Sequence, residues 1–294
     1  MMDKYFTQVA IEPASCKISH DETAWTVGSC FSDEIGRRMA EGGFNVRPNP
    51  LGTLFNPASI CRQLRRVTEG KPYVSEDLYR HDGLWHSHDF HSSFSAPEAS
   101  VALDAMNSAI ASLHAELPSL RYLILTMGSA RAFISKDTGC VVANCHKLPP
   151  DRFEIKDLST EEIVTDLTET FNILKSRTPQ LRIILTVSPV RHKAYGLHTD
   201  KLSKARLLLA ADELCSCGEA TYFPAYEIMT DELRDYRFYA PDMVHPSEMA
   251  AEHIYNRFAE TYFTPSTIND AACARKQARR QQHRSLSETR KSAT

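Results

Sequence analysis

Two apolar segments, 121–127 and 181–187, restrict the fold of this chain more than any other sequence feature. Both are rich in Leu, Ile, Val and Thr and are bounded by proline or glycine, which is typical of central strands in a parallel sheet. Segments with helical periodicity separate them from each other and from shorter strand-like stretches at 25–27, 44–47 and 220–223. This alternation predicts βαβ units and therefore an α/β fold with a mostly parallel central sheet.

Composition and charge favour a globular protein. The chain has 294 residues, of which 42% are hydrophobic and 24% are charged, with a net charge of -3, and this suits one α/β domain, expected over residues 1–266. Residues 267–294 are rich in Arg, Lys, Gln and Ser, so we expect a disordered basic tail. We interpret the basic run at 275–280 as solvated and expect no nucleic-acid partner, with contact to nucleic acid or to an acidic partner as the alternative interpretation of this run.

The distribution of apolar residues and cysteines bears on location. The first twenty residues lack the continuous apolar core of a secretory signal, and no apolar run approaches the ~18 residues of a membrane helix. The eight cysteines form no Cys-x-x-Cys pair, which favours free thiols in a reducing compartment. We therefore expect a cytoplasmic protein without a membrane partner.

A serine between an apolar run and a helical pattern, together with a late Asp-x-x-His motif, indicates hydrolytic chemistry. Ser29 follows the apolar run 24–27, and Asp242 and His245 lie three residues apart before a helix expected over 247–263. A serine hydroxyl becomes nucleophilic when an imidazole takes its proton and a carboxylate orients that imidazole. The sequence thus predicts Ser29 as nucleophile, His245 as general base and Asp242 as its orienting partner.

Each of these residues also has a simpler interpretation. Ser29 could only cap the following helix, Asp242 could be a turn residue and His245 a surface histidine, but their occurrence together favours catalysis. The neighbouring Cys30 competes as nucleophile because a thiol near a helix N-terminus is reactive. We favour Ser29 and expect Cys30 to be buried against the sheet.

The motif Gly28-Ser29-Cys30-Phe31-Ser32 and six further stretches resemble the GSCFA family, a branch of the SGNH (GDSL-like) hydrolase superfamily, over roughly residues 20 to 263. The other matching stretches are 49–53, 125–128, 144–147, 188–192, 222–227 and 242–246. The resemblance implies a flavodoxin-like three-layer α/β/α sandwich and an ester hydrolase with Ser29, Asp242 and His245 as its catalytic residues.

The resemblance also implies where the oxyanion would be held. It gives this role to the N–H groups of Ser29 and Gly52. The stretch 128–131 departs from the superfamily pattern because the asparagine expected two residues after Gly128 is missing. Asn144 or a backbone group is the expected substitute.

Three residues are candidates for substrate binding. Arg191 and His192 follow a strand end, at the expected rim of the cleft, and Tyr226 lies in an aromatic segment that suits either sugar stacking or simple packing. We expect a small-molecule or carbohydrate ester with a short acyl group such as acetyl. An O-acyltransferase with the same triad and a non-catalytic carbohydrate-binding protein are the alternatives.

The segment 81–91 is unusually rich in histidine and aspartate. Two imidazoles and a carboxylate could hold zinc or iron, whereas the aromatic residues in the same segment favour an amphipathic hairpin or lid beside the cleft. We favour the second interpretation and expect neither a metal nor a cofactor. The polar residues concerned are His81, Asp82, His86, His88, Asp89 and His91.

Overall fold

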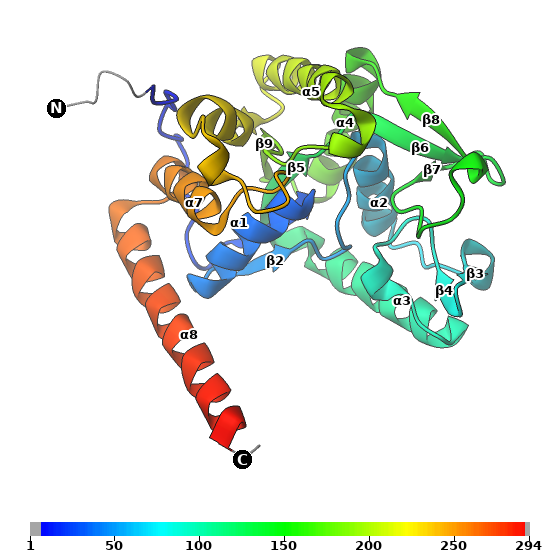
Figure 1. Ribbon diagram of the computed structural model, residues 1–294, viewed down its shortest axis with the longest axis horizontal. Helices are drawn as coiled ribbons and strands as arrows, with labels where there is room; N and C mark the ends of the chain where they lie inside the picture. The colour runs from blue at the N-terminus through cyan, green and yellow to red at the C-terminus, as the bar shows by residue number, and fades with distance from the viewer. Residues whose placement is uncertain (1–6, 292–294) are drawn as a thin grey trace.

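A five-stranded parallel sheet forms the centre of the computed structural model, which describes residues 7–291, with side chains to residue 278 and at 280 (Figure 1). Its strands are β1 (Thr23–Gly28), β2 (Val46–Pro48), β5 (Leu120–Met127), β9 (Arg182–Val187) and β10 (Thr221–Tyr222). The order across the sheet is β2-β1-β5-β9-β10, and every neighbouring pair is parallel. This is the flavodoxin-like order, so the predicted fold class is confirmed.

Helices cover both faces of this sheet because alternate strand residues point to opposite sides. Trp25 and Val27 of β1 pack in a first hydrophobic core on one face of the sheet, whereas Ala24 packs in a second core on the other face. The first layer contains α2 (Pro57–Glu69), α3 (Ala99–Glu116), α4 (Thr160–Arg177) and α5 (Leu197–Ser216), and the second contains α1 (Cys30–Glu41) and α7 (Glu248–Tyr262). None of the described helices is long and apolar enough to cross a bilayer.

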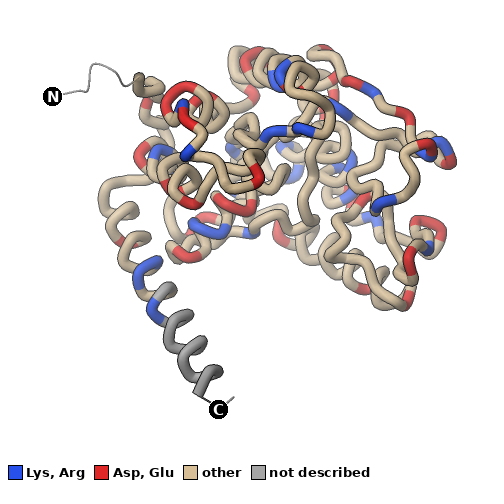
Figure 2. The backbone as a smooth tube through the Cα atoms, in the orientation of Figure 1, with Lys and Arg blue, Asp and Glu red and all other residues tan. Residues whose placement is uncertain are grey.

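The segment expected to be a disordered tail is instead helical. Helix α8 (Pro265–Lys291) packs its first part against α1 and α7 and then extends away from the body. Ala271 is 4% exposed, and Arg275 pairs with Glu252 of α7 at 2.6 Å. A few small or paired residues on one face thus dock a segment whose composition is polar. Along the described chain, Lys and Arg are interspersed with Asp and Glu (Figure 2).

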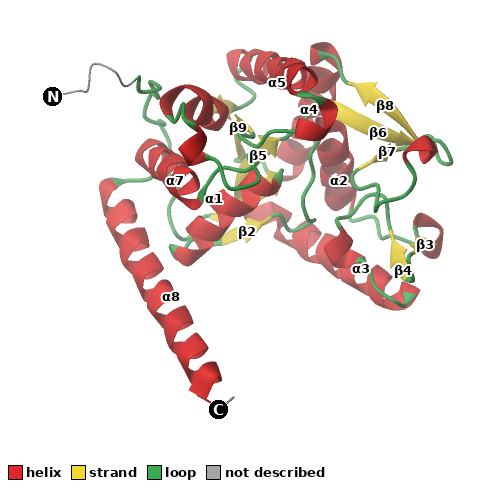
Figure 3. Cartoon of the chain, viewed as in Figure 1, coloured by secondary structure: helices red, strands yellow, loops and turns green. Residues whose placement is uncertain are grey.

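A small antiparallel sheet and a hairpin extend the molecule at the end remote from α8 (Figure 3). The sheet contains β6 (Arg131–Ser135), β7 (Val141–Val142) and β8 (Phe153–Asp157), and the hairpin contains β3 (Tyr79–His81) and β4 (Leu84–His86). The backbone N–H of Ala143 donates to His88 O at 2.8 Å and connects the two units. The sequence indicated a hairpin near 81–91 but not the sheet.

The chain leaves β1 through a tight turn that only glycine fits. Gly28 has a φ of +134°, and a Cβ there would lie 2.1 Å from Thr126 O. The Gly28 N–H donates to Asn49 Oδ1 at 2.9 Å, and the Ser29 N–H donates to Thr126 O at 3.0 Å. Asn49 Nδ2 in turn donates to Ser29 O at 3.2 Å. The buried Asn49 therefore holds the turn in a fixed position against β5.

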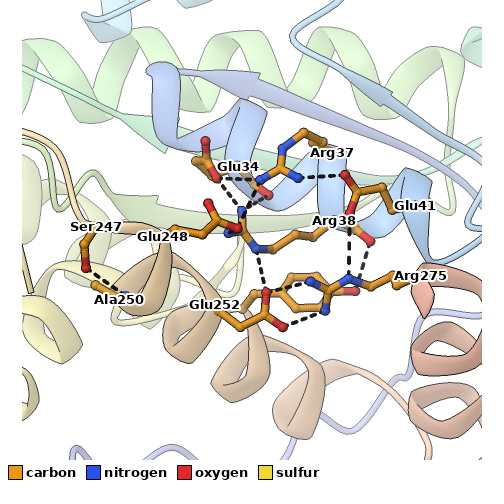
Figure 4. Close-up of polar contacts among 10 residues, drawn as sticks. Glu34, Arg37, Arg38, Glu41, Ser247, Glu248, Ala250, Glu252 and Arg275 are labelled. Atoms are coloured by element: carbon orange, nitrogen blue, oxygen red, sulfur yellow. Dashed lines mark hydrogen bonds and ion pairs between the residues drawn. The ribbon is translucent and has the colours of Figure 1, made fainter. Parts of the chain in front are cut away.

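A buried arginine connects α1 to α7, and a carboxylate that it shares extends the network to α8 (Figure 4). Arg38 of α1 is fully buried and donates to Glu248 at 2.6 Å and to Glu252 at 3.2 Å, both on α7. It also pairs with Glu34, one turn earlier in α1. Because Glu252 binds Arg275 of α8 as well, one carboxylate joins α1, α7 and α8.

We expect Gly28→Ala to destabilise the protein far more than Gly139→Ala. Both glycines have positive φ, so each alanine adds about 1–3 kcal/mol of backbone strain. Only the Gly28 variant also forces a Cβ into a carbonyl oxygen, since nothing lies within 4 Å of a Cβ at Gly139. Urea unfolding of both variants measures the difference, and equal losses would contradict the close approach at Gly28.

We expect Arg38→Met to lower the free energy of unfolding by about 1–3 kcal/mol, because it leaves three carboxylates without their shared cation. The matched control is Arg37→Met on the same helix, whose side chain is 44% exposed and whose ion pairs should contribute less than about 1 kcal/mol. Chemical denaturation compares the two, and a larger loss in Arg37→Met would contradict the importance of the buried arginine.

Candidate active site

A cavity of about 560 Å³ opens beyond the carboxyl ends of β1, β5 and β9. Ligand sites of parallel α/β sheets lie at this end, next to the point where the strand order reverses. The small sheet contributes Arg131, Phe133 and Val142 to its wall, so the insertion after β5 closes one side of the cavity. Further lining residues are Cys30, Thr53, Phe55, Asn56, His91, Ser129, Asn144, Arg191, His192, Tyr195, Val244 and His245.

The Asp-x-x-His motif forms a hydrogen-bonded pair at the cavity. His245 Nδ1 lies 2.6 Å from Asp242 Oδ2, while Asp242 Oδ1 accepts the N–H groups of Val244 and His245 at 2.8 and 3.0 Å. The hydrogen bond from His245, followed by the two backbone donors, holds the pKa of Asp242 well below its usual range. Asp242 therefore stays ionised and fixes the imidazole orientation, leaving Nε2 for a substrate or nucleophile.

Backbone hydrogen bonds hold the loop that carries this pair. The Ala240 N–H donates to His245 O at 2.8 Å, and the Arg191 N–H donates to Val244 O at 3.2 Å. Ser247 caps the following helix α7 by accepting the Ala250 N–H at 3.3 Å. The imidazole is thus positioned from the end of β9 on one side and from α7 on the other.

Ser29 and Cys30 occupy different environments. The Ser29 side chain is 1% exposed, and its Oγ accepts the Phe31 N–H at 3.3 Å as the N-cap of α1. Ser29 is not among the residues that line the cavity, whereas Cys30 lines it together with His245. Cys30 also packs partly against the second core and has intermediate exposure. Adjacent residues of this turn point in different directions, and Cys30 is the one at the cavity.

The Cys30 thiol is protonated at neutral pH. Burial, followed by the charge of Asp33, raises its pKa to about 11, while its own backbone N–H and the Lys204 ammonium act in the opposite direction. A thiol in this environment is not a ready thiolate. It needs a base at the moment of attack to become nucleophilic.

A buried lysine that the sequence analysis did not identify lies beneath this site. Lys204 of α5 is 1% exposed and donates to Gly128 O at 2.6 Å and to Ser188 O at 2.8 Å, the carbonyls just beyond β5 and β9. Burial lowers its pKa to about 8, partly offset by Asp200. The sequence did contain a signal for this burial. Lys204 lies three and seven residues before the buried Leu207 and Ala211, a spacing that places it on the apolar face of the helix.

The predicted oxyanion donors differ from those that the structure offers. The Ser29 N–H donates to Thr126 O and the Gly52 N–H to Asn49 O, so neither is available in this conformation. Within residues 7–291 the Cys30 N–H donates to no other residue, since it is the first residue of α1. Asn56 and Asn144 both line the cavity, and each uses its Oδ1 to accept a backbone N–H, which leaves the amide N–H₂ as a donor.

The three predicted substrate-binding residues are not all brought together. Arg191 and His192 line the cavity, and burial lowers the pKa of His192 to about 4, so this imidazole is neutral at pH 7. His192 stacks on Tyr195 with ring centroids 5.8 Å apart. Tyr226 does not line the cavity and instead packs against the first core, with its hydroxyl accepting from Lys201 at 2.5 Å.

The histidine-rich segment packs as an aromatic cluster beside the cavity. His86 lies between Ser95 Oγ at 2.7 Å and His81 O at 3.1 Å, and its ring stacks on Tyr79. His146 joins the cluster through Ser87 O at 2.9 Å, and burial lowers its pKa to about 4. Among the described residues, no group of three or more His, Cys, Asp or Glu side chains is arranged to hold a metal ion.

We expect the stability difference between the wild type and Lys204→Met to change with pH. Because the folded-state pKa of Lys204 lies below its unfolded value, the unfolded state binds more protons between pH 8 and 10.5. The wild type should therefore gain stability relative to the variant as pH rises, by about 1.4 kcal/mol per pH unit at most. Urea unfolding at pH 7, 8, 9 and 10 measures this, and a flat or falling difference would contradict the lowered pKa.

Comparisons with known proteins give a family and several partial structural likenesses. A proposed acylhydrolase from Bacteroides fragilis has a TM-score of 0.42 and 10% identity, covering 83% of this chain and 89% of that chain. A family 3 carbohydrate esterase from Talaromyces cellulolyticus has a TM-score of 0.38 and 9% identity, covering 85% and 98%. An acetyl xylan esterase from Butyrivibrio proteoclasticus has a TM-score of 0.36 and 10% identity, covering 83% and 64%. No curated protein sequence matches the chain. The sequence pattern of the GSCFA family matches residues 23–258, and the chain belongs to this family.

Proposed function

We propose that this protein hydrolyses a carboxylic ester through a covalent thioester on Cys30. The observation that carries the proposal is that Cys30 and the Asp242-paired His245 line the same cavity at the carboxyl end of the sheet. A nucleophile, a base and a group that orients the base are the three parts of such chemistry. In this proposal Cys30 is the nucleophile, the role that the sequence predicts for Ser29.

The first half of the reaction transfers the acyl group to sulfur. His245 Nε2 takes the proton from the Cys30 thiol as Sγ attacks the ester carbonyl, and Asp242 stabilises the imidazolium that forms. The carbonyl oxygen becomes an oxyanion, which the free Cys30 N–H and the amide groups of Asn56 and Asn144 are suited to receive. Collapse breaks the bond to the alcohol oxygen, which leaves with the proton from His245.

The second half releases the acyl group. Water attacks the thioester while His245 accepts its proton, and the breakdown of the second oxyanion gives a carboxylic acid and the Cys30 thiol. Because burial keeps the thiol neutral in the resting state, proton transfer to His245 accompanies the attack rather than preceding it. The positive charge of Lys204 favours the negative charge that develops on sulfur.

The size of the cavity suits a small-molecule or carbohydrate ester. Its volume of about 560 Å³ is enough for a short acyl group such as acetyl together with part of the alcohol. Transfer of the acyl group to a sugar hydroxyl instead of water would use the same residues. Product analysis with and without a carbohydrate acceptor separates the two reactions.

We expect Cys30→Ala to abolish acylation by 4-nitrophenyl acetate, while Ser29→Ala retains it. The first variant loses the attacking atom, which costs on the order of a thousandfold or more in rate. The second loses only the cap of α1, worth about 1 kcal/mol of stability. Intact-mass and peptide mass spectrometry after rapid acid quenching locate the acyl group, and Cys217→Ala is the control for an exposed thiol outside the cavity.

The site of the adduct decides between the two neighbours. An acetyl group on Ser29 in the wild type, lost only in Ser29→Ala, would overturn the thiol mechanism and restore the serine prediction. In His245→Gln the adduct on Cys30 should form more slowly and, once formed, persist, because the base acts in both halves of the reaction; acylation at the wild-type rate would contradict its role in the first half.

A further inference from the structure

A second, smaller hollow of about 240 Å³ adjoins the proposed active site. Arg191 lines both spaces, and its backbone N–H donates to Val244 O in the loop that carries His245. The hollow therefore lies next to the end of β9 and to the loop that carries His245. Arg191 is the residue that the two spaces share.

Three cations surround this hollow without carboxylate partners among the described residues. They are Arg191, Lys201 at the start of α5, and Arg234 after the π-helical turn Ile228–Glu232. Arg191 lies over the Tyr239 ring at 3.8 Å from its centroid, and Lys201 Nζ donates to Tyr226 Oη at 2.5 Å. An aromatic ring thus positions Arg191 and a hydroxyl positions Lys201, and both cations keep donors unused.

One acidic residue also lines the hollow, but it is already paired. Asp235 accepts from the Arg237 backbone N–H at 2.8 Å and from its guanidinium at 3.2 Å. Its partner is thus Arg237 rather than Arg191, Lys201 or Arg234. By contrast, Arg38 of α1 and Arg275 of α8 both bind carboxylates.

We propose that this hollow binds an oxyanion group of the substrate, a carboxylate or a phosphate, and so selects acidic esters. The proposal rests on the proposed function for the reaction, but the hollow itself is independent of the nucleophile. Guanidinium and ammonium groups bind carboxylate and phosphate through charge-assisted hydrogen bonds. The apolar side chains of Met229 and Leu233 line the same space.

The kinetic test compares esters that differ only in one charged group. The anionic series contains the 4-nitrophenyl hemiesters of succinic, glutaric and adipic acid, and the neutral series contains 4-nitrophenyl butyrate, valerate and hexanoate of the same length. We expect at least one anionic ester to have a kcat/KM about tenfold above its neutral counterpart, mainly through KM. This ratio should fall toward one in Arg191→Gln, Lys201→Gln and Arg234→Gln.

The matched control is Lys71→Gln, which removes the same unit charge from an exposed position outside both spaces. Its ratio should equal that of the wild type, which excludes an effect of net charge alone. Equal kcat/KM values for both series in the wild type, or a ratio unchanged in all three hollow variants, would overturn the proposal.

A binding measurement keeps the hollow testable even if no ester is hydrolysed. Isothermal titration calorimetry of Cys30→Ala with monomethyl glutarate and dimethyl glutarate compares an anion with its neutral ester, and inorganic phosphate serves as competitor. Binding of the monoester alone, weakened in Arg234→Gln, supports a carboxylate site. Displacement by phosphate at lower concentration supports a phosphate site. Equal affinity for both glutarates, with no effect of phosphate, would overturn the proposal, whereas failure of hydrolysis alone overturns only the proposed reaction.

Discussion

The turn that follows β1 is the constraint on which the rest of the site depends. Gly28 lies against the backbone of β5 so closely that no side chain fits, and the Asn49 amide bonds both to Gly28 and to Ser29 O. These contacts fix where α1 begins and therefore which residue of the turn reaches the cavity.

Two buried cations then hold the layers around that turn. Arg38 connects α1 to α7, the helix that follows the His245 loop, while Lys204 connects the carbonyl groups beyond β5 and β9. Burial of a charge is costly, so each persists only because it has several acceptors. Carboxylates accept from Arg38, and backbone carbonyl groups accept from Lys204. Cys30 and His245, which are more than two hundred residues apart in the chain, thereby line one cavity.

Much of the architecture could be predicted from local patterns. The apolar segments 121–127 and 181–187 form the central strands β5 and β9. Ser159, the serine of a capping box, is the N-cap of α4. The small sheet was missed because β6, β7 and β8 are short and partly exposed, so their periodicity is weak. Helix α8 was missed because its docking depends on partners such as Glu252, which lie elsewhere in the chain.

The sequence by itself determined the parallel α/β sheet, the turn at Gly28 and the pairing of Asp242 with His245, since each follows from periodicity or from residues close together in the chain. Only the tertiary structure decided which residue of the Ser29-Cys30 pair lines the cavity, which N–H groups are free, and that Lys204 lies beneath the site. Side-chain direction at a turn and the burial of a charge depend on distant segments that local patterns do not encode.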